Sequence, residues 1–263
     1  MTVAAAPVEY SIDARGIAHI HLNRPTASNA LDPELAAALE AAIESLAAEP
    51  NARVLVLSGS GKNFCAGGDV RRMAGASDTP AFLTDLAGTV HRALVKLDSL
   101  PVTVVAAVQG SAAGAGLGLV LAADFVVASA SSKFVAAYSA VGLSPDCGVS
   151  TLLPRVVGLR RATQMLLTAK VVGAAEALDW GLITDLVDDD AVGTRVDELA
   201  DLLARAPFPA VGQTRRLARA SFARTYAEHL DDEASTIAAV SSSKESVARI
   251  SRWAPPTHVS GNP

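Results

Sequence analysis

The chain has 263 residues, half of them hydrophobic and 4% aromatic, and 22 basic against 27 acidic residues give a formal net charge of −5. The lack of a basic block and the few aromatic residues argue against a nucleic-acid partner. Mean hydropathy is +0.32, yet the longest apolar run, around 102–123, is broken by Gln109, Ser111 and glycines, and it cannot span a membrane.

The N-terminal residues lack the basic start and apolar centre of a secretory signal. Cys65 and Cys147 imply no disulfide framework, and neither has a second cysteine or a histidine at metal-ligand spacing. We therefore expect a soluble cytoplasmic protein that has no membrane span and holds no metal.

The first elements in chain order are predicted to be a hairpin and a helix. Val8–Ile12 and Ile17–Leu22 alternate around a glycine turn, as antiparallel strands do. Asp32 and Pro33 then stand where a helix takes its N-cap and its first residue.

Three short apolar runs, Val54–Leu57, Val102–Val108 and Phe125–Ala128, have the pattern of strands buried on both faces. Helical patterns separate them, which indicates an α/β domain. Beyond about residue 188 the pattern is entirely helical. The sequence therefore predicts an α/β core over 1–190 and a helical C-terminal region over 191–263.

The first segment that could carry chemistry is "SGSGKNFCAGGDV" (58–70), which follows a predicted strand. A phosphate-binding P-loop is excluded, because Val56 and Asn63 stand where that motif needs Gly and Ser or Thr. Ala66, Gly67 and Gly68 leave backbone N–H groups able to approach a ligand. The alternative is a plain glycine turn leading into a helix.

The second segment is "VQGSAAGAGLGLVLAADF" (108–125), whose glycine spacing does not fit a dinucleotide-binding fingerprint. It is typical of a tight turn into a buried helix, whose N-terminus favours an anion or a developing oxyanion. The alternative is that its glycines only permit close helix–strand packing. Together, the two loops could direct two N–H groups at one carbonyl oxygen, as in an oxyanion hole.

The third segment is "VGLSPDCGVS" (141–150), in which Asp146 lies between a proline and a glycine. Asp in this setting commonly stabilises a turn. It could equally present one carboxylate at the mouth of an apolar pocket, and the segment alone leaves both interpretations open.

Five segments together resemble the enoyl-CoA hydratase/isomerase (crotonase) superfamily, in order from about residue 8 to 190. They are "LNRPTASNAL" (22–31), "NFCAGGDV" (63–70), "VQGSAAGAGLGLVLAADF" (108–125), "FVAAYSAVGLSPDCGVSTLLPRVVG" (134–158) and "AEALDWGLITDLV" (175–187).

The resemblance implies an α/β crotonase-like spiral of repeated ββα turns. Residues 1–190 would form its acyl-CoA-binding core, and the all-helical region 191–263 would mediate a homotrimer, often stacked as a hexamer. It also implies an acyl-CoA thioester substrate and no separate cofactor, because coenzyme A is part of the substrate.

Residue by residue, the resemblance places the two oxyanion-hole donors on the N–H groups of Gly68 and Ala115. Most members have glycine at the second position, and the alanine methyl narrows the loop's conformational choice. The resemblance also implies a set of residues that bind coenzyme A and the acyl group: Arg24, Ala27, Ala66, Gly67, Asp69, Gly114 and Tyr138.

Hydratases of the family resemble one another in two glutamates that hold the water to be added. Here these positions are Gly118 and Tyr138, so the two-carboxylate mechanism is not expected. Asp146 matches the aspartate that several isomerases of the family use. The resemblance therefore predicts a double-bond isomerase in which Asp146 moves one proton between two carbons.

Alternatives remain open. One is a dehalogenase like the family's chlorobenzoyl-CoA enzyme, in which the aspartate is a nucleophile and a histidine the base; His91 lies two residues away from the place of that base in an ungapped count. Others are a hydratase with an atypical site, and a member that binds acyl-CoA without turnover or serves as a structural subunit.

Overall fold

The computed structural model describes residues 5–253, which divide into two compact units, the first ending at Ala204 and the second beginning at Arg205. In the first unit, the main sheet has the order β1-β2-β3-β4-β6-β9, and a small sheet has the order β5-β7-β8. The strands are β1 (Val8–Ile12), β2 (Ile17–Leu22), β3 (Val54–Gly59), β4 (Thr103–Val108), β5 (Ser111–Ala113), β6 (Phe125–Ser129), β7 (Lys133–Val135), β8 (Val171–Gly173) and β9 (Asp185–Val187).

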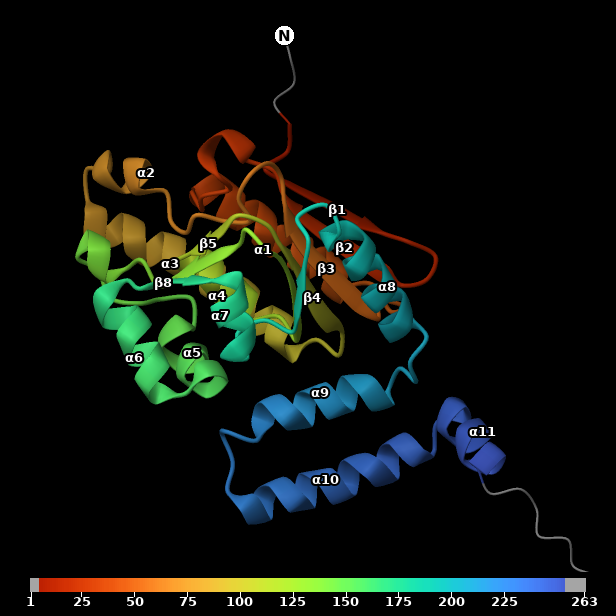
Figure 1. The fold of residues 1–263 in the computed structure, drawn as a ribbon. Coiled ribbons are helices and arrows are strands. Elements are labelled where there is room, and N and C mark those ends of the chain that lie inside the picture. Colours follow the sequence, from red (N-terminus) through yellow and green to blue (C-terminus); the bar gives the residue numbers. More distant parts are fainter. Residues whose placement is uncertain (1–4, 254–263) are drawn as a thin grey trace, which may run out of the picture. The chain divides into compact units, whose positions relative to one another are not determined.

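The helices of this unit follow the strands in repeated ββα turns, such as β1-β2-α1 and β4-β5-α4 (Figure 1). They are α1 (Pro33–Ala47), α2 (Val70–Ala74), α3 (Thr79–Ser99), α4 (Ala115–Leu121), α5 (Val149–Val157), α6 (Leu159–Thr168), α7 (Ala174–Asp179) and α8 (Val192–Ala204), with short 3-10 turns at Pro25–Ala27 and Ser139–Val141. The predicted α/β spiral is therefore confirmed.

The local predictions at the N-terminus are confirmed as well. β1 and β2 pair antiparallel with Val8 opposite Leu22, while the other strands of the main sheet run parallel. The Asp32 side chain accepts the Leu35 N–H at 2.9 Å and caps α1, with Pro33 as its first residue.

Two apolar layers cover the faces of the main sheet. One contains side chains of α1 and α3, such as Leu39 and Val90. The other is formed by α8, whose Val196 and Leu199 pack with Val56 and Val105. Because α8 completes the second layer, the first unit extends to Ala204 and not to residue 190 as the sequence suggested.

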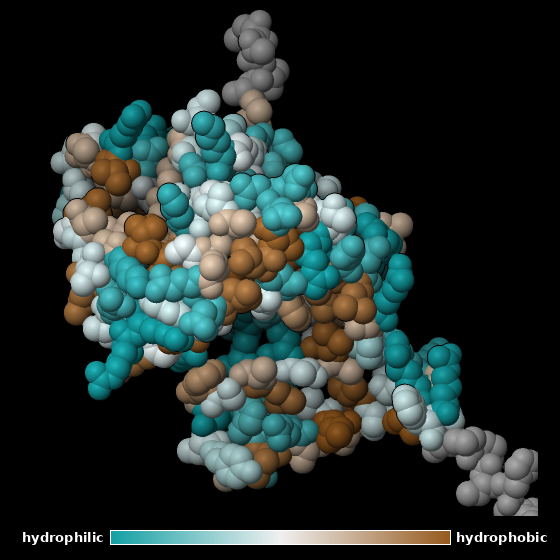
Figure 2. Space-filling model, in the orientation of Figure 1, coloured by the Kyte–Doolittle hydropathy of each residue, from teal (hydrophilic) through white to brown (hydrophobic). Residues whose placement is uncertain are grey.

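The second unit contains α9 (Ala210–Ala220), α10 (Tyr226–Ser241) and α11 (Lys244–Trp253). An ion pair between Arg216 of α9 and Asp232 of α10, at 2.7 Å, joins two of its helices. Leu230 and Ile237 on α10 are exposed, and brown apolar side chains stand among polar ones on the surface in Figure 2. Residues 254–263, which the predicted C-terminal region includes, lie outside the described part.

Within residues 5–253, none of the helices combines the length and the apolar character needed to cross a membrane.

Candidate active site

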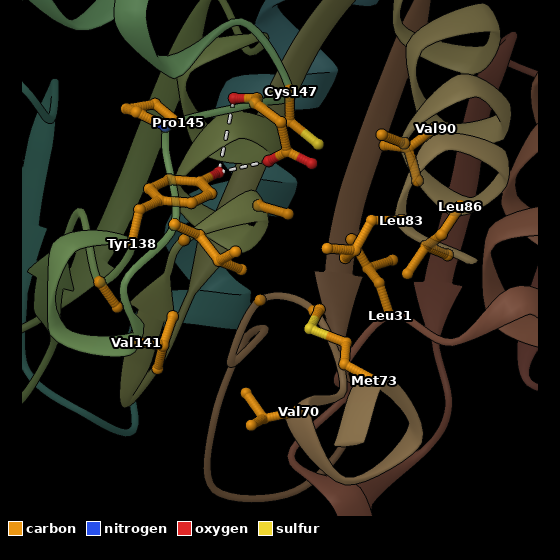
Figure 3. A pocket seen from close by; sticks show the side chains of 18 of the residues that line it. Leu31, Val70, Met73, Leu83, Leu86, Val90, Tyr138, Val141, Pro145 and Cys147 are labelled. Carbon is orange, nitrogen blue, oxygen red and sulfur yellow. Dashed lines mark hydrogen bonds between the residues drawn. The ribbon is translucent and has the colours of Figure 1, made fainter. Parts of the chain in front are cut away.

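A cavity of about 240 Å³ opens in the first unit between α2, α3 and the loop that follows β7 (Figure 3). Its walls are mostly apolar, so it suits the acyl part of a ligand. The apolar side chains labelled in Figure 3 are Leu31, Val70, Met73, Leu83, Leu86, Val90, Val141 and Pro145. Of the described residues that line it, only Asp146 carries a side-chain carboxylate.

The loop after β3 forms one side of the cavity with its backbone. The Leu31 N–H donates to Gly67 O at 2.7 Å, and the Asp69 N–H donates to Leu31 O at 2.9 Å. Gly67 has a φ of +92°, and a Cβ there would lie 2.7 Å from Ala113 O. Only glycine therefore permits this close approach to the second loop.

The second glycine loop leads into α4 beside the first. Gly114 is the N-cap with a φ of +51°, and Ala115 is the first residue of the helix. The left-handed conformation thus falls on the glycine, and the alanine occupies an ordinary helical position. The sequence suggested that the Ala115 methyl narrows the conformational choice of the loop. Because Ala115 has a helical backbone conformation, the methyl imposes no such restriction at this residue.

Gly68 and Ala115 both line the cavity. Within residues 5–253, neither N–H donates to a backbone or side-chain acceptor. A free N–H at the start of a helix is available to a ligand. The structure therefore brings the two predicted donors to one cavity, with Gly67 and Gly114 between them, and their role as an oxyanion hole stays a prediction.

Tyr138 and Asp146 face each other across the loop that follows β7. The Tyr138 hydroxyl donates to Asp146 Oδ1 at 2.6 Å and lies 3.4 Å from Asp146 O, as the dashed lines in Figure 3 show. Burial, together with the nearby Asp146 charge, raises the pKa of Tyr138 far above its usual value. Tyr138 is therefore a donor that stays protonated and holds the Oδ1 atom of the Asp146 carboxylate.

Position 118 has no room for a side chain. A Cβ on Gly118 would lie 2.7 Å from Cys147 O and 2.8 Å from Cys147 Cβ. Because α4 packs directly on the loop that carries Asp146, the glutamate of the hydratases cannot be accommodated there on this backbone. The missing carboxylate is thus a feature of the packing as well as of the sequence.

His91 of α3 lies beside this loop, although the ungapped count placed it two residues from the position of the dehalogenase's histidine base. Its Nε2 accepts the Cys147 N–H at 3.0 Å. A sequence signal was present, because Leu83, Ala87 and His91 repeat every four residues on one helical face. Leu83 and Ala87 line the cavity, so the same face carries His91 towards the site.

His91, Asp146 and Cys147 are also the described residues that could together hold a metal, since their ligand atoms lie within 4.8 Å of one another. Burial raises the pKa of the Cys147 thiol, which disfavours the thiolate that a metal requires. His91 Nε2 is already engaged. These groups do not fit a metal centre well, and the absence of a metal stays a prediction.

The residues predicted to bind coenzyme A lie close together, but Arg24 is already occupied. Its guanidinium pairs with Asp32 at 3.0 Å and Asp69 at 3.3 Å. The Ala66 N–H donates to Ser28 O at 3.0 Å and joins the two segments. Of the residues predicted to bind coenzyme A and the acyl group, four line the cavity: Ala66, Gly67, Gly114 and Tyr138. Arg24, Ala27 and Asp69 remain predicted coenzyme A contacts.

Comparisons with known proteins agree with this arrangement. The family model "Enoyl-CoA hydratase/isomerase" matches residues 13–253. The 1,2-epoxyphenylacetyl-CoA isomerase of Escherichia coli is 36% identical, over 83% of this chain and 84% of its own. A protein of Rhodobacter capsulatus named "Probable enoyl-CoA hydratase" is 40% identical, over 80% and 79%.

A solved structure of the enoyl-CoA hydratase of Mycobacterium smegmatis superposes with a TM-score of 0.89 at 29% identity, and the match covers 94% of this chain and 96% of that one. With the spiral of ββα turns and the family motifs in place, the chain belongs to the enoyl-CoA hydratase/isomerase family of acyl-CoA enzymes.

Proposed function

We propose that the enzyme is an enoyl-CoA isomerase that moves a double bond by a 1,3-proton shift. The supporting observation is that Asp146 provides the one side-chain carboxylate among the described residues of the cavity. A shift needs a single group that removes and returns the same proton, whereas water addition in the family uses two carboxylates. The closed position at Gly118 favours the first chemistry.

The steps follow from the arrangement of the groups. The Asp146 carboxylate takes a proton from C2 of a 3-enoyl thioester, and the electron pair moves to the thioester oxygen. The N–H groups of Gly68 and Ala115 stabilise that charge. The protonated Asp146 returns the proton to C4, the double bond forms between C2 and C3, and the carboxylate is restored.

The substitution Asp146→Asn tests this mechanism. We expect the rate of conjugation of a 3-enoyl-CoA, followed by thioester absorbance, to fall by about 10²–10⁴-fold. Binding of a saturated acyl-CoA should persist, because the amide has nearly the shape of the carboxylate. Asp197→Asn, at an exposed position of α8, is the matched control and should keep full activity.

The other outcomes identify the alternatives. Wild-type turnover in Asp146→Asn would exclude Asp146 as the base. Consumption of 2-enoyl-CoA by wild type, without isomerisation of 3-enoyl-CoA, would indicate a hydratase with an atypical site. Tight binding of acyl-CoA with no turnover at any chain length would indicate a catalytically silent member.

The position of His91 favours one second candidate, a dehalogenase acting on an aromatic acyl-CoA. Asp146 would displace halide from the ring carbon, and water deprotonated by His91 would release the hydroxylated product. His91 Nε2, however, would first have to leave the Cys147 N–H. Chloride release from a chlorobenzoyl-CoA tests this candidate, and we expect none.

We also propose that the protein is a homotrimer or hexamer that requires no cofactor besides the coenzyme A of its substrate. The exposed apolar side chains of α10 and α11, among them Ile237 and Ile250, support a subunit interface. Light scattering on the full chain measures the assembly, and a monomer would contradict the proposal.

A further inference from the structure

We infer that His91 is a positioning residue, which holds the Asp146–Cys147 peptide through its contact with the Cys147 N–H and thereby aims the Asp146 carboxylate. The inference rests on the proposed role of Asp146 and assigns His91 no contact with the substrate. It begins from one hydrogen bond between α3 and the Asp146 loop, 56 residues apart in the chain.

The backbone at Cys147 needs such support. Cys147 has a φ of +49°, in the left-handed region that residues other than glycine rarely adopt, and the next residue, Gly148, has a φ of +75°. Cys147 is also fully buried. Its N–H donates to His91 Nε2 at 3.0 Å, and without His91 it would have no acceptor among residues 5–253.

The peptide that joins Asp146 to Cys147 is held at both ends. Its carbonyl oxygen accepts the Val149 N–H at 3.0 Å, and its N–H donates to His91. A peptide unit is planar, so two such bonds fix its rotation. Fixing this plane restrains ψ of Asp146 and φ of Cys147, and so restrains the backbone from which the Asp146 side chain leaves.

Two further contacts surround the loop without replacing His91. The backbone of Gly118 packs against Cys147 O and Cβ, which blocks movement towards α4. The Tyr138 hydroxyl donates a hydrogen bond to Asp146 Oδ1 at 2.6 Å. Neither of them contacts the Cys147 N–H, so among the described residues His91 holds the N–H end of this peptide.

The same hydrogen bond argues against His91 as a general base. Accepting an N–H requires the lone pair of Nε2, and that lone pair is the one a base would use. The bond also requires the ring tautomer that carries its proton on Nδ1. His91 therefore acts on the loop as a fixed acceptor.

Glutamine and asparagine provide a matched pair of variants. The amide of glutamine reaches the position of Nε2 and can accept the Cys147 N–H, whereas that of asparagine reaches only the position of Nδ1. We expect His91→Asn and His91→Leu to lower kcat by about 100-fold with KM within about twofold of wild type, and His91→Gln to stay within about fivefold of wild-type kcat.

A general base would give a different pattern, because neither amide can take up a proton. Equal loss in His91→Gln and His91→Asn would therefore overturn the inference, as would wild-type kcat in both. If His91→Leu does not fold, the Gln and Asn pair still decides. His19→Leu, on β2 and outside the cavity lining, is the control.

Amide hydrogen exchange at Cys147 gives a readout independent of turnover. We expect exchange about tenfold or more faster in His91→Asn than in wild type, and slow exchange in His91→Gln. If wild type isomerises no 3-enoyl-CoA, the proposed function fails while this measurement still tests the positioning role. Unchanged exchange in His91→Asn would overturn it.

Discussion

The backbone wall of the cavity, residues 66–68 and 114–116, and the Asp146 wall, residues 138–148, offer a ligand different kinds of group. The backbone wall presents N–H groups, and close packing of glycines places them. The Asp146 wall presents one carboxylate, which accepts a hydrogen bond from Tyr138, and His91 accepts the neighbouring Cys147 N–H. The first wall should therefore fail when a Cβ is added, and the second when a hydrogen bond is removed.

The substitution Gly67→Ala should have the largest effect on the backbone wall. The new Cβ would lie 2.7 Å from Ala113 O, at a φ of +92° that alanine disfavours. The two loops must separate, and we expect kcat to fall by about 10²–10³-fold, as on loss of one oxyanion-hole donor. Steady-state kinetics on a 3-enoyl-CoA measures it.

Gly181→Ala separates the effect of backbone strain from the effect of a steric clash. Gly181 has a φ of +74°, but a Cβ there would meet no atom within 4 Å. This control should therefore lower stability and leave kcat near wild type. A kcat near that of wild type in both Gly67→Ala and Gly181→Ala would show that the close packing of the loops is not needed for activity.

Tyr138→Phe tests the Asp146 wall and should have a smaller effect. The carboxylate stays in place but loses its 2.6 Å hydrogen bond at Oδ1, and we expect kcat to fall by about 10- to 100-fold, in line with the strength of a hydrogen bond to a charged group. Because the pKa of Tyr138 is raised, the pH–rate profile of wild type should show no alkaline limb from this phenol at the pH where a tyrosine ordinarily ionises. A pH–rate profile of both proteins checks this, and an unchanged kcat would contradict the role of Tyr138.

The sequence anticipated the two walls to different extents. Gly67 and Gly114 are predictable from the sequence because a tight turn and a close approach favour glycine locally, and Asp32 is predictable because a helix cap is a local signal. The contact of His91 with Cys147 joins residues 56 apart, and an ungapped count missed it. Likewise, the packing of Gly118 on Cys147 depends on the tertiary fold, and no local pattern shows it.

The end of the first unit shows the same limit. The sequence predicts helices beyond about residue 188, but a helical pattern does not identify what each helix packs against. In the structure, Val196 and Leu199 of α8 pack on the main sheet, so α8 belongs with the core. Periodicity predicts an element and its apolar face, whereas its partner follows only from the assembled fold.

A stability prediction concerns Cys65, buried beneath the backbone wall, where its thiol donates to Asn29 O at 3.1 Å. Burial raises the pKa of Cys65 from 9.0 to about 12. Above pH ~9 the thiol of the unfolded chain ionises, whereas the thiol of the folded chain stays protonated. The free energy of unfolding should therefore fall as the pH rises above ~9, and the fall should level off where the folded thiol ionises.

Cys65→Ser removes this titration and keeps a donor. Between pH ~8 and ~10, we expect the loss in free energy of unfolding to be about 1 kcal/mol smaller in the variant than in wild type. Urea unfolding at both pH values measures it. Burial also raises the pKa of Cys147, so part of the alkaline loss should remain. Equal losses in the two proteins would contradict the burial argument.

The smallest effect on activity is expected at Arg24, outside both walls. Its guanidinium pairs with Asp32 and Asp69, but an arginine has five N–H donors, so some remain for a phosphate of coenzyme A. We expect Arg24→Gln to raise KM for an acyl-CoA by about 3- to 10-fold, as on loss of one exposed charge contact, with kcat nearly unchanged. Arg195→Gln, which breaks the 2.7 Å pair with Asp185, is the control and should leave KM unchanged. If Arg24→Gln lowers only the unfolding free energy, Arg24 serves the ion network and the coenzyme A contact must be sought elsewhere.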